Sequence, residues 1–192
     1  SGSSGPGGEG RDEVFAQLGV EQIQQLRGAD NPWLLVTSFV NPHDITLWGS
    51  LALAGDLSGA QGSFYLAEQL VGSNVPRDLF GPAYTQSTNE DLSTKPVAQK
   101  SFVSQYPEAF QPLRNDSDYH RFYYQLQQNV DKQIGKVIDA LTDDRKQYRD
   151  TIVIYLSDHG EMLGAHGGMF QKWHAAYDEM LRVPFMFHNP EL

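Results

Sequence analysis

Two short polar clusters stand out in the sequence because each combines a histidine with a carboxylate at the end of an apolar run. They are Asn41-Pro42-His43-Asp44 and Ser157-Asp158-His159-Gly160-Glu161. In open parallel sheets, ligands bind just beyond the carboxyl ends of the strands. We therefore predict that His43, Asp158 and His159 converge in one crevice, where an adjacent carboxylate and imidazole supply an oxygen and a nitrogen to one divalent cation. Two ligands make an incomplete metal site, and an Asp-His-Gly turn is also typical of an aspartate that caps a helix.

A second group of titratable side chains follows this turn and is interspersed with glycines. It consists of Glu161, His166, Lys172 and His174. Glycine-rich loops that are dense in titratable groups are where binding sites tend to lie. The alternative interpretation is a polar surface loop in which Lys172 is solvated and His174 packs on Trp173.

The elements that must position these residues follow from the apolar periodicity. Apolar residues at helical spacing predict a helix over 12–27 and a longer helix from Asp116 or Ser117 to Leu141. Nearly continuous apolar runs predict buried strands at Trp33–Val40 and Thr151–Leu156, with a third strand at Val183–Phe187. A helix followed by a buried strand is typical of an α/β fold with a parallel sheet.

The remaining segments have no regular pattern. Residues 1–10 are almost wholly small, which predicts a flexible lead-in. Residues 44–116 contain only short apolar patches, and a connection of this length normally shapes a binding surface or a lid. We therefore treat residues 11–192 as one domain with an irregular insertion at about 45–116.

Composition excludes several classes of function. The chain has 192 residues, with 14 Lys and Arg against 24 Asp and Glu, so its formal net charge is −10. An acidic surface argues against nucleic acid or an anionic membrane as the main partner. No apolar run approaches the roughly 20 residues of a membrane span. Because the chain contains no cysteine, it has neither a cysteine nucleophile nor a cysteine zinc site.

Five blocks near the C-terminus resemble, in order and spacing, the sulfatase catalytic domain of the alkaline phosphatase superfamily. They are Ser157-Asp158-His159-Gly160-Glu161-Met162-Leu163-Gly164, His166-Gly167, Gln171-Lys172-Trp173, Tyr177-Asp178-Glu179 and Arg182-Val183-Pro184-Phe185. The sequence is most similar to the arylsulfatase and choline-sulfatase-like branches. The resemblance implies a partial alkaline-phosphatase-like sandwich, with a mostly parallel sheet flanked by helices and without the N-terminal part of the fold.

The resemblance also implies a role for individual residues. Asp158 and His159 match the family's metal-binding pair, and Lys172 and His43 match residues that bind the substrate and act in catalysis. A lysine can balance charge on the transferred group, and an imidazole can donate a proton to a leaving alkoxide. His166 and His174 are secondary candidates, for which a supporting or packing role is an open alternative. The implied cofactor is a divalent metal ion, calcium by resemblance, although one Asp and one His also suit manganese or zinc.

One departure from the family pattern limits this interpretation. The family's nucleophile lies in a Cys-x-Pro-x-Arg or Ser-x-Pro-x-Arg motif and is converted to formylglycine, and this sequence has neither motif. We therefore expect a C-terminal segment of a longer sulfatase that is inactive alone and is completed by the missing N-terminal half of the fold. The expected substrate is a small-molecule or carbohydrate sulfate ester, and the resemblance favours a periplasmic or extracellular location.

Two alternative functions remain open at this point. The chain could belong to a phosphodiesterase or phosphonate monoester hydrolase of the same superfamily, because that branch shares the Asp158-His159 pair. It could also be a non-catalytic binding module that keeps a sulfatase-like shell without its nucleophile.

Overall fold

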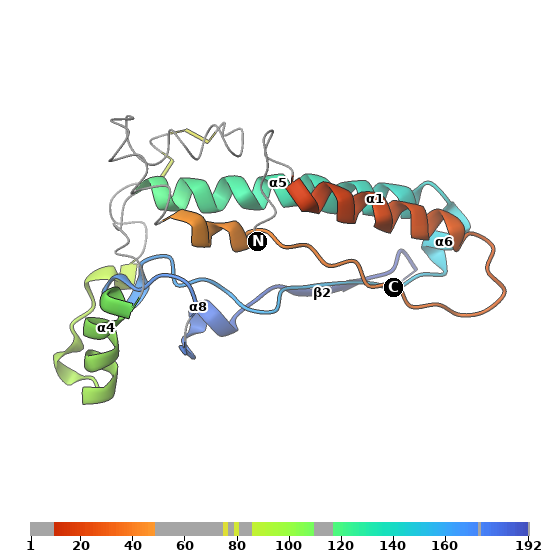
Figure 1. The fold of residues 1–192 in the computed structure, drawn as a ribbon. Coiled ribbons are helices and arrows are strands. Elements are labelled where there is room, and N and C mark those ends of the chain that lie inside the picture. Colours follow the sequence, from red (N-terminus) through yellow and green to blue (C-terminus); the bar gives the residue numbers. More distant parts are fainter. Residues whose placement is uncertain are drawn as a thin grey trace.

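The computed structural model describes residues 10–48, 75–76, 79–80, 86–109, 117–172 and 174–191. These form an elongated molecule in which two helices lie side by side above a two-stranded sheet (Figure 1). The longer elements are α1 (Gly10–Gln25), α4 (Val97–Ala109), α5 (Ser117–Thr142), β1 (Val153–Leu156) and β2 (Phe185–His188). The predicted lead-in, apart from Gly10, and much of the predicted insertion lie outside the described residues. None of the described helices is both long and apolar enough to cross a membrane.

Helix α5 packs against α1, against the short helix α6 (Arg145–Arg149) and against the turn η1 (His43–Leu47). Its apolar positions Phe122, Leu126 and Val130 are buried, as their helical spacing predicts. The N-terminal half of α5 packs with Trp48 and Phe170, and its C-terminal end packs with the buried face of α1. The two predicted helices are therefore confirmed as α1 and α5, and they bury apolar side chains against each other.

The predicted strand at Trp33–Val40 is not a strand in the structure. The exposure of its side chains still alternates along the segment, with Leu34 89% exposed and Val36 74% exposed. Leu35 points the other way and packs against the cluster that contains Ile23 and Leu141. A strand needs a hydrogen-bonded neighbour as well as an apolar sequence, and this segment pairs with no described strand. It is an extended segment that packs on one side only.

The sheet also corrects the expected strand direction. β1 and β2 confirm two of the three predicted strands, but they pair antiparallel, with Val153 opposite His188 and Leu156 opposite Phe185. The chain between them holds only the short helices α7 (Ala165–Gly168) and α8 (Asp178–Leu181). It returns directly to β1 without the long crossover helix that a parallel pair normally has. The expectation of a mostly parallel sheet is thus wrong for the described strands, whereas the α/β class with flanking helices holds.

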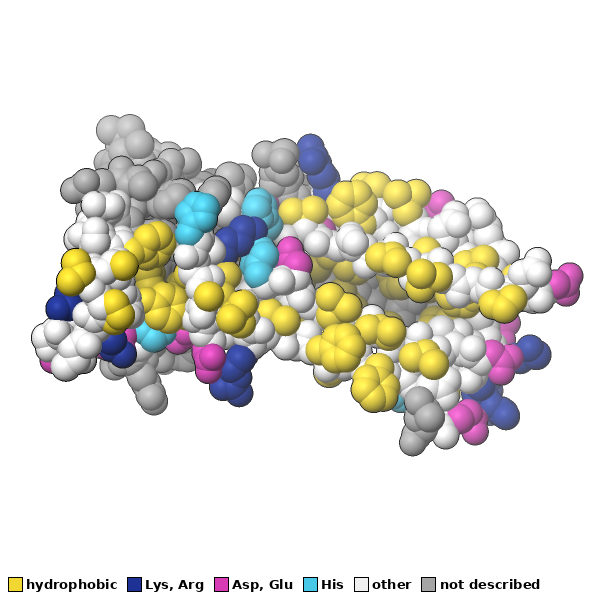
Figure 2. Space-filling model, turned by 90° about the horizontal axis from the view of Figure 1, so that it is seen from below, with side chains coloured by type: hydrophobic (Ala, Val, Ile, Leu, Met, Phe, Trp, Pro, Cys, Tyr) yellow, Lys and Arg dark blue, Asp and Glu magenta, His cyan; other side chains and the backbone are white. Residues whose placement is uncertain are grey.

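Both faces of this two-stranded sheet carry exposed apolar side chains, so the prediction that the strand at Thr151–Leu156 is buried is wrong for the described residues. Ile154 and Phe187 form a cross-strand pair on one face and are 58% and 66% exposed, while Met186 on the other face is 56% exposed. Figure 2 shows apolar side chains spread over the half of the molecule that contains the two strands. A two-stranded sheet alone is marginally stable, and large exposed apolar patches mark surfaces that are normally covered.

The irregular segment contains helices that the sequence did not predict. They are α4 and the short turns η1 (His43–Leu47), η2 (Gln86–Asn89) and η3 (Leu92–Thr94). α4 has no continuous apolar stripe and carries Pro107 near its end. Phe102 and Val103 pack against a buried methionine cluster that includes Met162 and Met180. Tertiary packing therefore stabilises a helix whose own periodicity is weak.

Helix α8 approaches the chain very closely at Gly160. The Gly160 N–H donates to the Met180 carbonyl over 2.9 Å. A Cβ at Gly160 would lie 1.8 Å from the carbonyl oxygen of Glu179, which no side chain tolerates. Only glycine permits this contact, so Gly160 fixes the position of α8 against the Asp158-His159 turn.

The first prediction concerns Asp12, which is buried in the first turn of α1. Its two carboxylate oxygens accept from the N–H groups of Val40 (2.7 Å) and Asn41 (3.1 Å). Asp12→Ala leaves both donors without this partner and should lower the free energy of unfolding by about 1–3 kcal/mol. Glu13→Ala is the matched control because Glu13, within the described part of the chain, makes an exposed 3.7 Å ion pair with Lys136. Equal denaturation midpoints for the two variants would contradict the role given to Asp12.

The second prediction concerns the close contact at Gly160. Gly160→Ala should lower the free energy of unfolding by about 1–3 kcal/mol, because α8 must move away from the added methyl group. Gly135→Ala is the control, since a Cβ at Gly135 in α5 meets nothing within 4 Å. That variant should be stabilised by about 0.5–1 kcal/mol through helix propensity. Thermal unfolding of the two proteins separates these opposite signs.

Candidate functional site

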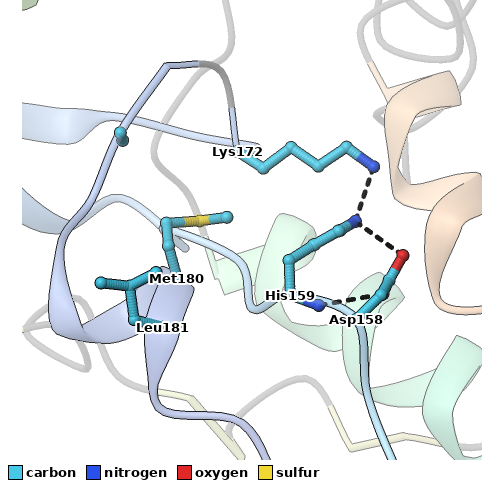
Figure 3. Close-up of a pocket in the computed structure, with 6 residues that line it drawn as sticks. Asp158, His159, Lys172, Met180 and Leu181 are labelled. Atoms are coloured by element: carbon cyan, nitrogen blue, oxygen red, sulfur yellow. Dashed lines mark hydrogen bonds and ion pairs between the residues drawn. The ribbon is translucent and has the colours of Figure 1, made fainter.

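A pocket opens where β1 ends and is bounded by three segments of the chain. Its volume is 270 Å³, and it is lined by Asp158, His159, Lys172, Ala175, Met180 and Leu181. The polar side chains form one wall, and Met180 and Leu181 come from α8 on the other (Figure 3). The pocket therefore lies beyond the carboxyl end of a strand, where the sequence predicted it.

The orientation of His159 is determined by a hydrogen bond to its own neighbour. His159 Nδ1 lies 2.8 Å from the Gly160 carbonyl oxygen, which can only accept, so Nδ1 carries the proton. In the neutral ring, Nε2 then presents its lone pair to the pocket. Lys172 Nζ lies 2.6 Å from this nitrogen and donates to it. Fixing one ring nitrogen through a backbone carbonyl is how proteins orient a histidine that binds a cation.

Asp158 stands beside this imidazole and remains open to solvent. The Asp158 Oδ1 accepts from the backbone N–H of His159 over 3.0 Å, and the Asp158 Oδ2 lies 3.5 Å from Nε2 of the His159 ring. The Asp158 side chain is 85% exposed, whereas the His159 side chain is 35% exposed. A carboxylate oxygen and an imidazole nitrogen thus lie together on one side of the pocket, within reach of a cationic lysine.

These two side chains fit part of the coordination sphere of a divalent cation. The chemistry of the donors is right, because an aspartate oxygen and a neutral imidazole nitrogen both bind such ions. Among the described residues, however, no group of three or more His, Asp or Glu is arranged to hold a metal. Asp158 and His159 thus place one oxygen donor beside one nitrogen donor, and metal binding by this pair stays a prediction.

Glu161 is a contributor to the site that was not among the predicted site residues. Its Oε1 accepts from the Gln171 N–H (2.6 Å) and from the Tyr119 hydroxyl (2.8 Å). Burial raises the pKa of the Glu161 carboxyl, even though these hydrogen bonds favour its ionised form. The contact holds the backbone just before Lys172, where Gln171 has a φ of 62°. The sequence had placed Glu161 among the titratable residues of this loop without a role, and its position directly after Asp158-His159-Gly160 is the signal that could have assigned it one.

His43 and the two secondary histidines are not among the residues that line the pocket. His43 begins η1 and is exposed, and it is not among the residues that line the pocket. His174 is exposed with a φ of 51°, and Trp173, on which it was alternatively expected to pack, lies outside the described residues. His166 is half-buried and lies between two carboxylates instead. The pocket thus unites Asp158, His159 and Lys172 from the predicted set.

Comparison with known proteins places this geometry in a family. The sulfatase family profile matches residues 2–192. The chain is 38% identical over 172 residues to an arylsulfatase of Clostridium perfringens and 31% identical over 173 residues to an uncharacterized sulfatase, YidJ, of Escherichia coli. These alignments cover 88% and 90% of this chain, but 31% and 29% of the two relatives.

Solved structures agree with the sequence comparison at the level of the fold. The structure of a 2-O GAG sulfatase is similar with a TM-score of 0.62 at 23% identity, over 95% of this chain and 36% of that protein. The chain spans between 29% and 36% of the length of the three relatives described here. The match of the family profile over nearly the whole chain, together with this fold, shows that the chain belongs to the sulfatase family.

Proposed function

We propose that the chain supplies part of the active site of a metal-dependent sulfatase that hydrolyses sulfate esters. The observation that carries this proposal is the orientation of His159. Its Nε2 lone pair is held toward the pocket by the Gly160 carbonyl, with Asp158 and Lys172 on either side. In this assignment Asp158 and His159 bind the metal ion, and Lys172 and His43 act on the substrate.

Each side chain has a task that suits its chemistry. Lys172 brings a compact positive charge to the oxygens of the transferred sulfuryl group, where negative charge accumulates. His43 donates a proton to the departing alkoxide, and its exposed position on η1 leaves the ring accessible to a leaving group. Asp158 and His159 would hold a divalent cation, which when bound would supply Lewis acidity to the sulfuryl group. Calcium follows from the family resemblance, while the nitrogen donor also suits manganese or zinc.

The rest of the site, in this proposal, comes from a part of the fold outside this chain. That part supplies the formylglycine nucleophile and the remaining metal ligands. Two observations support this assignment. The described residues provide two donors in place of a complete coordination sphere. The extended segment 33–40 and the two faces of the β1–β2 sheet leave apolar side chains exposed, as expected of surfaces against which further strands and helices pack.

The experiment that tests the proposal uses the native gene product and the 192-residue chain in parallel. Both are assayed with a sulfate monoester and with a phosphate diester, before and after treatment with a chelator. We expect the native product to prefer the sulfate ester by kcat/KM, to lose activity with the chelator, and to be larger than this chain. The isolated chain should hydrolyse neither ester. A preference for the diester would assign the phosphodiesterase alternative, and a native product that hydrolyses neither would favour the binding module.

A third prediction isolates the contribution of Lys172 in the active native protein. Lys172→Ala should lower kcat/KM for the sulfate ester about a hundredfold or more, on the scale of losing one preorganised electrostatic donor. Lys132→Ala is the control, because Lys132 is an exposed lysine of α5 that does not line the pocket. An unchanged rate in the Lys172 variant would remove this lysine from the site.

A further inference from the structure

His166 lies between two carboxylates that come from distant parts of the chain. Its Nδ1 is 2.7 Å from Oε2 of Glu90, and its Nε2 is 3.1 Å from Oε2 of Glu179. Carboxylates accept hydrogen bonds, so both contacts are hydrogen bonds only when the ring carries a proton on each nitrogen. The side chain of His166 is 18% exposed, and its ring stacks on Tyr177 at 4.1 Å with an interplanar angle of 17°.

The surroundings of this histidine hold it in place from several sides. The Lys95 Nζ also lies 2.8 Å from the Glu90 Oε1. The hydrogen bond from Lys95 is the larger cause, and that from His166 the smaller one, of a lowered pKa of the Glu90 carboxyl. The backbone N–H of His166 donates to the Ser87 hydroxyl over 3.3 Å. The backbone of His166 adopts a φ of 51°, a conformation that a non-glycine residue keeps only when its contacts enforce it.

The second carboxylate of this cluster connects it to the pocket. Glu179 belongs to α8, and its carbonyl oxygen lies against the α-carbon of Gly160, where an added Cβ would be only 1.8 Å away. The next residue, Met180, accepts the hydrogen bond of the Gly160 N–H and lines the pocket. A displacement of the Glu179 side chain therefore also moves the α8 backbone at Glu179 and Met180, which contacts Gly160, the residue that follows His159.

We propose that Glu90, His166 and Glu179 form a hydrogen-bonded clamp that ties α8 to the 86–95 segment, and that His166 is a positioning residue for the Asp158-His159 turn. None of these three residues lines the pocket, and the clamp acts on it through the α8 backbone. The role of the Asp158-His159 turn in metal binding rests on the proposed function, whereas the clamp rests on contacts within the chain. It gives the 86–95 part of the irregular insertion a mechanical connection to the predicted metal ligands.

The test follows the Gly160 amide and the His159 ring by NMR in the 192-residue chain. We expect His166→Gln and Glu179→Gln each to shift both signals and to speed Gly160 hydrogen exchange about tenfold, since the local opening becomes easier. Asp178→Asn is the matched control: Asp178 is the neighbouring carboxylate on α8, and it makes only an exposed 3.8 Å contact with Arg182. This control should leave both signals unchanged.

A double-mutant cycle separates the clamp from general stability. If His166 acts on Gly160 through Glu179, the His166→Gln/Glu179→Gln protein should exchange no faster at Gly160 than the more affected single variant. Additive effects would overturn the proposal, as would changes spread evenly over α1 and α5. Gly160 and His159 signals that stay in place in both single variants would also overturn it. None of these readouts requires hydrolysis of an ester, so an incorrect functional assignment would leave the result intact.

Discussion

The structure of the site depends on a backbone contact that only glycine allows. At Gly160 the chain passes so close to α8 that the carbonyl of Glu179 occupies the place of a side chain. The same residue uses its own carbonyl to orient the imidazole of His159. One small residue thus fixes both walls of the pocket: the polar wall through the ring of His159, and the apolar wall through the register of α8. The contact with the Gly160 carbonyl sets the position and the tautomer of the neutral imidazole together.

The parts of this arrangement that could be predicted are those encoded in local pattern. The spacing of Phe122, Leu126 and Val130 predicted α5, because these side chains are buried on one face of one helix. The apolar, β-prone run before Ser157 predicted β1, although its side chains are mostly exposed. The pocket holds Asp158 and His159 of the predicted group of His43, Asp158 and His159, together with Lys172, which the family resemblance had assigned to the site. In these cases the chemistry and the geometry lie within a short stretch of sequence.

What could not be predicted depends on contacts between distant segments. Trp33–Val40 has the sequence of a strand, but strand pairing requires a neighbour that its own residues do not specify. α4 is held by packing of Phe102 and Val103 on methionines far along the chain, so its periodicity carried little signal. His166 illustrates the same limit at the site: its two partners, Glu90 and Glu179, are separated by most of the C-terminal half, and no motif joins them.

The apolar side chains exposed on both faces of the β1–β2 sheet affect how copies of this polypeptide associate in solution. β1 and β2 expose hydrophobic residues on both faces, and the extended Leu34 and Val36 segment has main-chain groups with no described strand beside it. Unpaired β-prone backbone next to bare apolar surface is a template for edge-to-edge growth between molecules. The acidic net charge makes copies of the isolated polypeptide repel one another and so keeps it in solution. Salt screens this repulsion and therefore promotes aggregation.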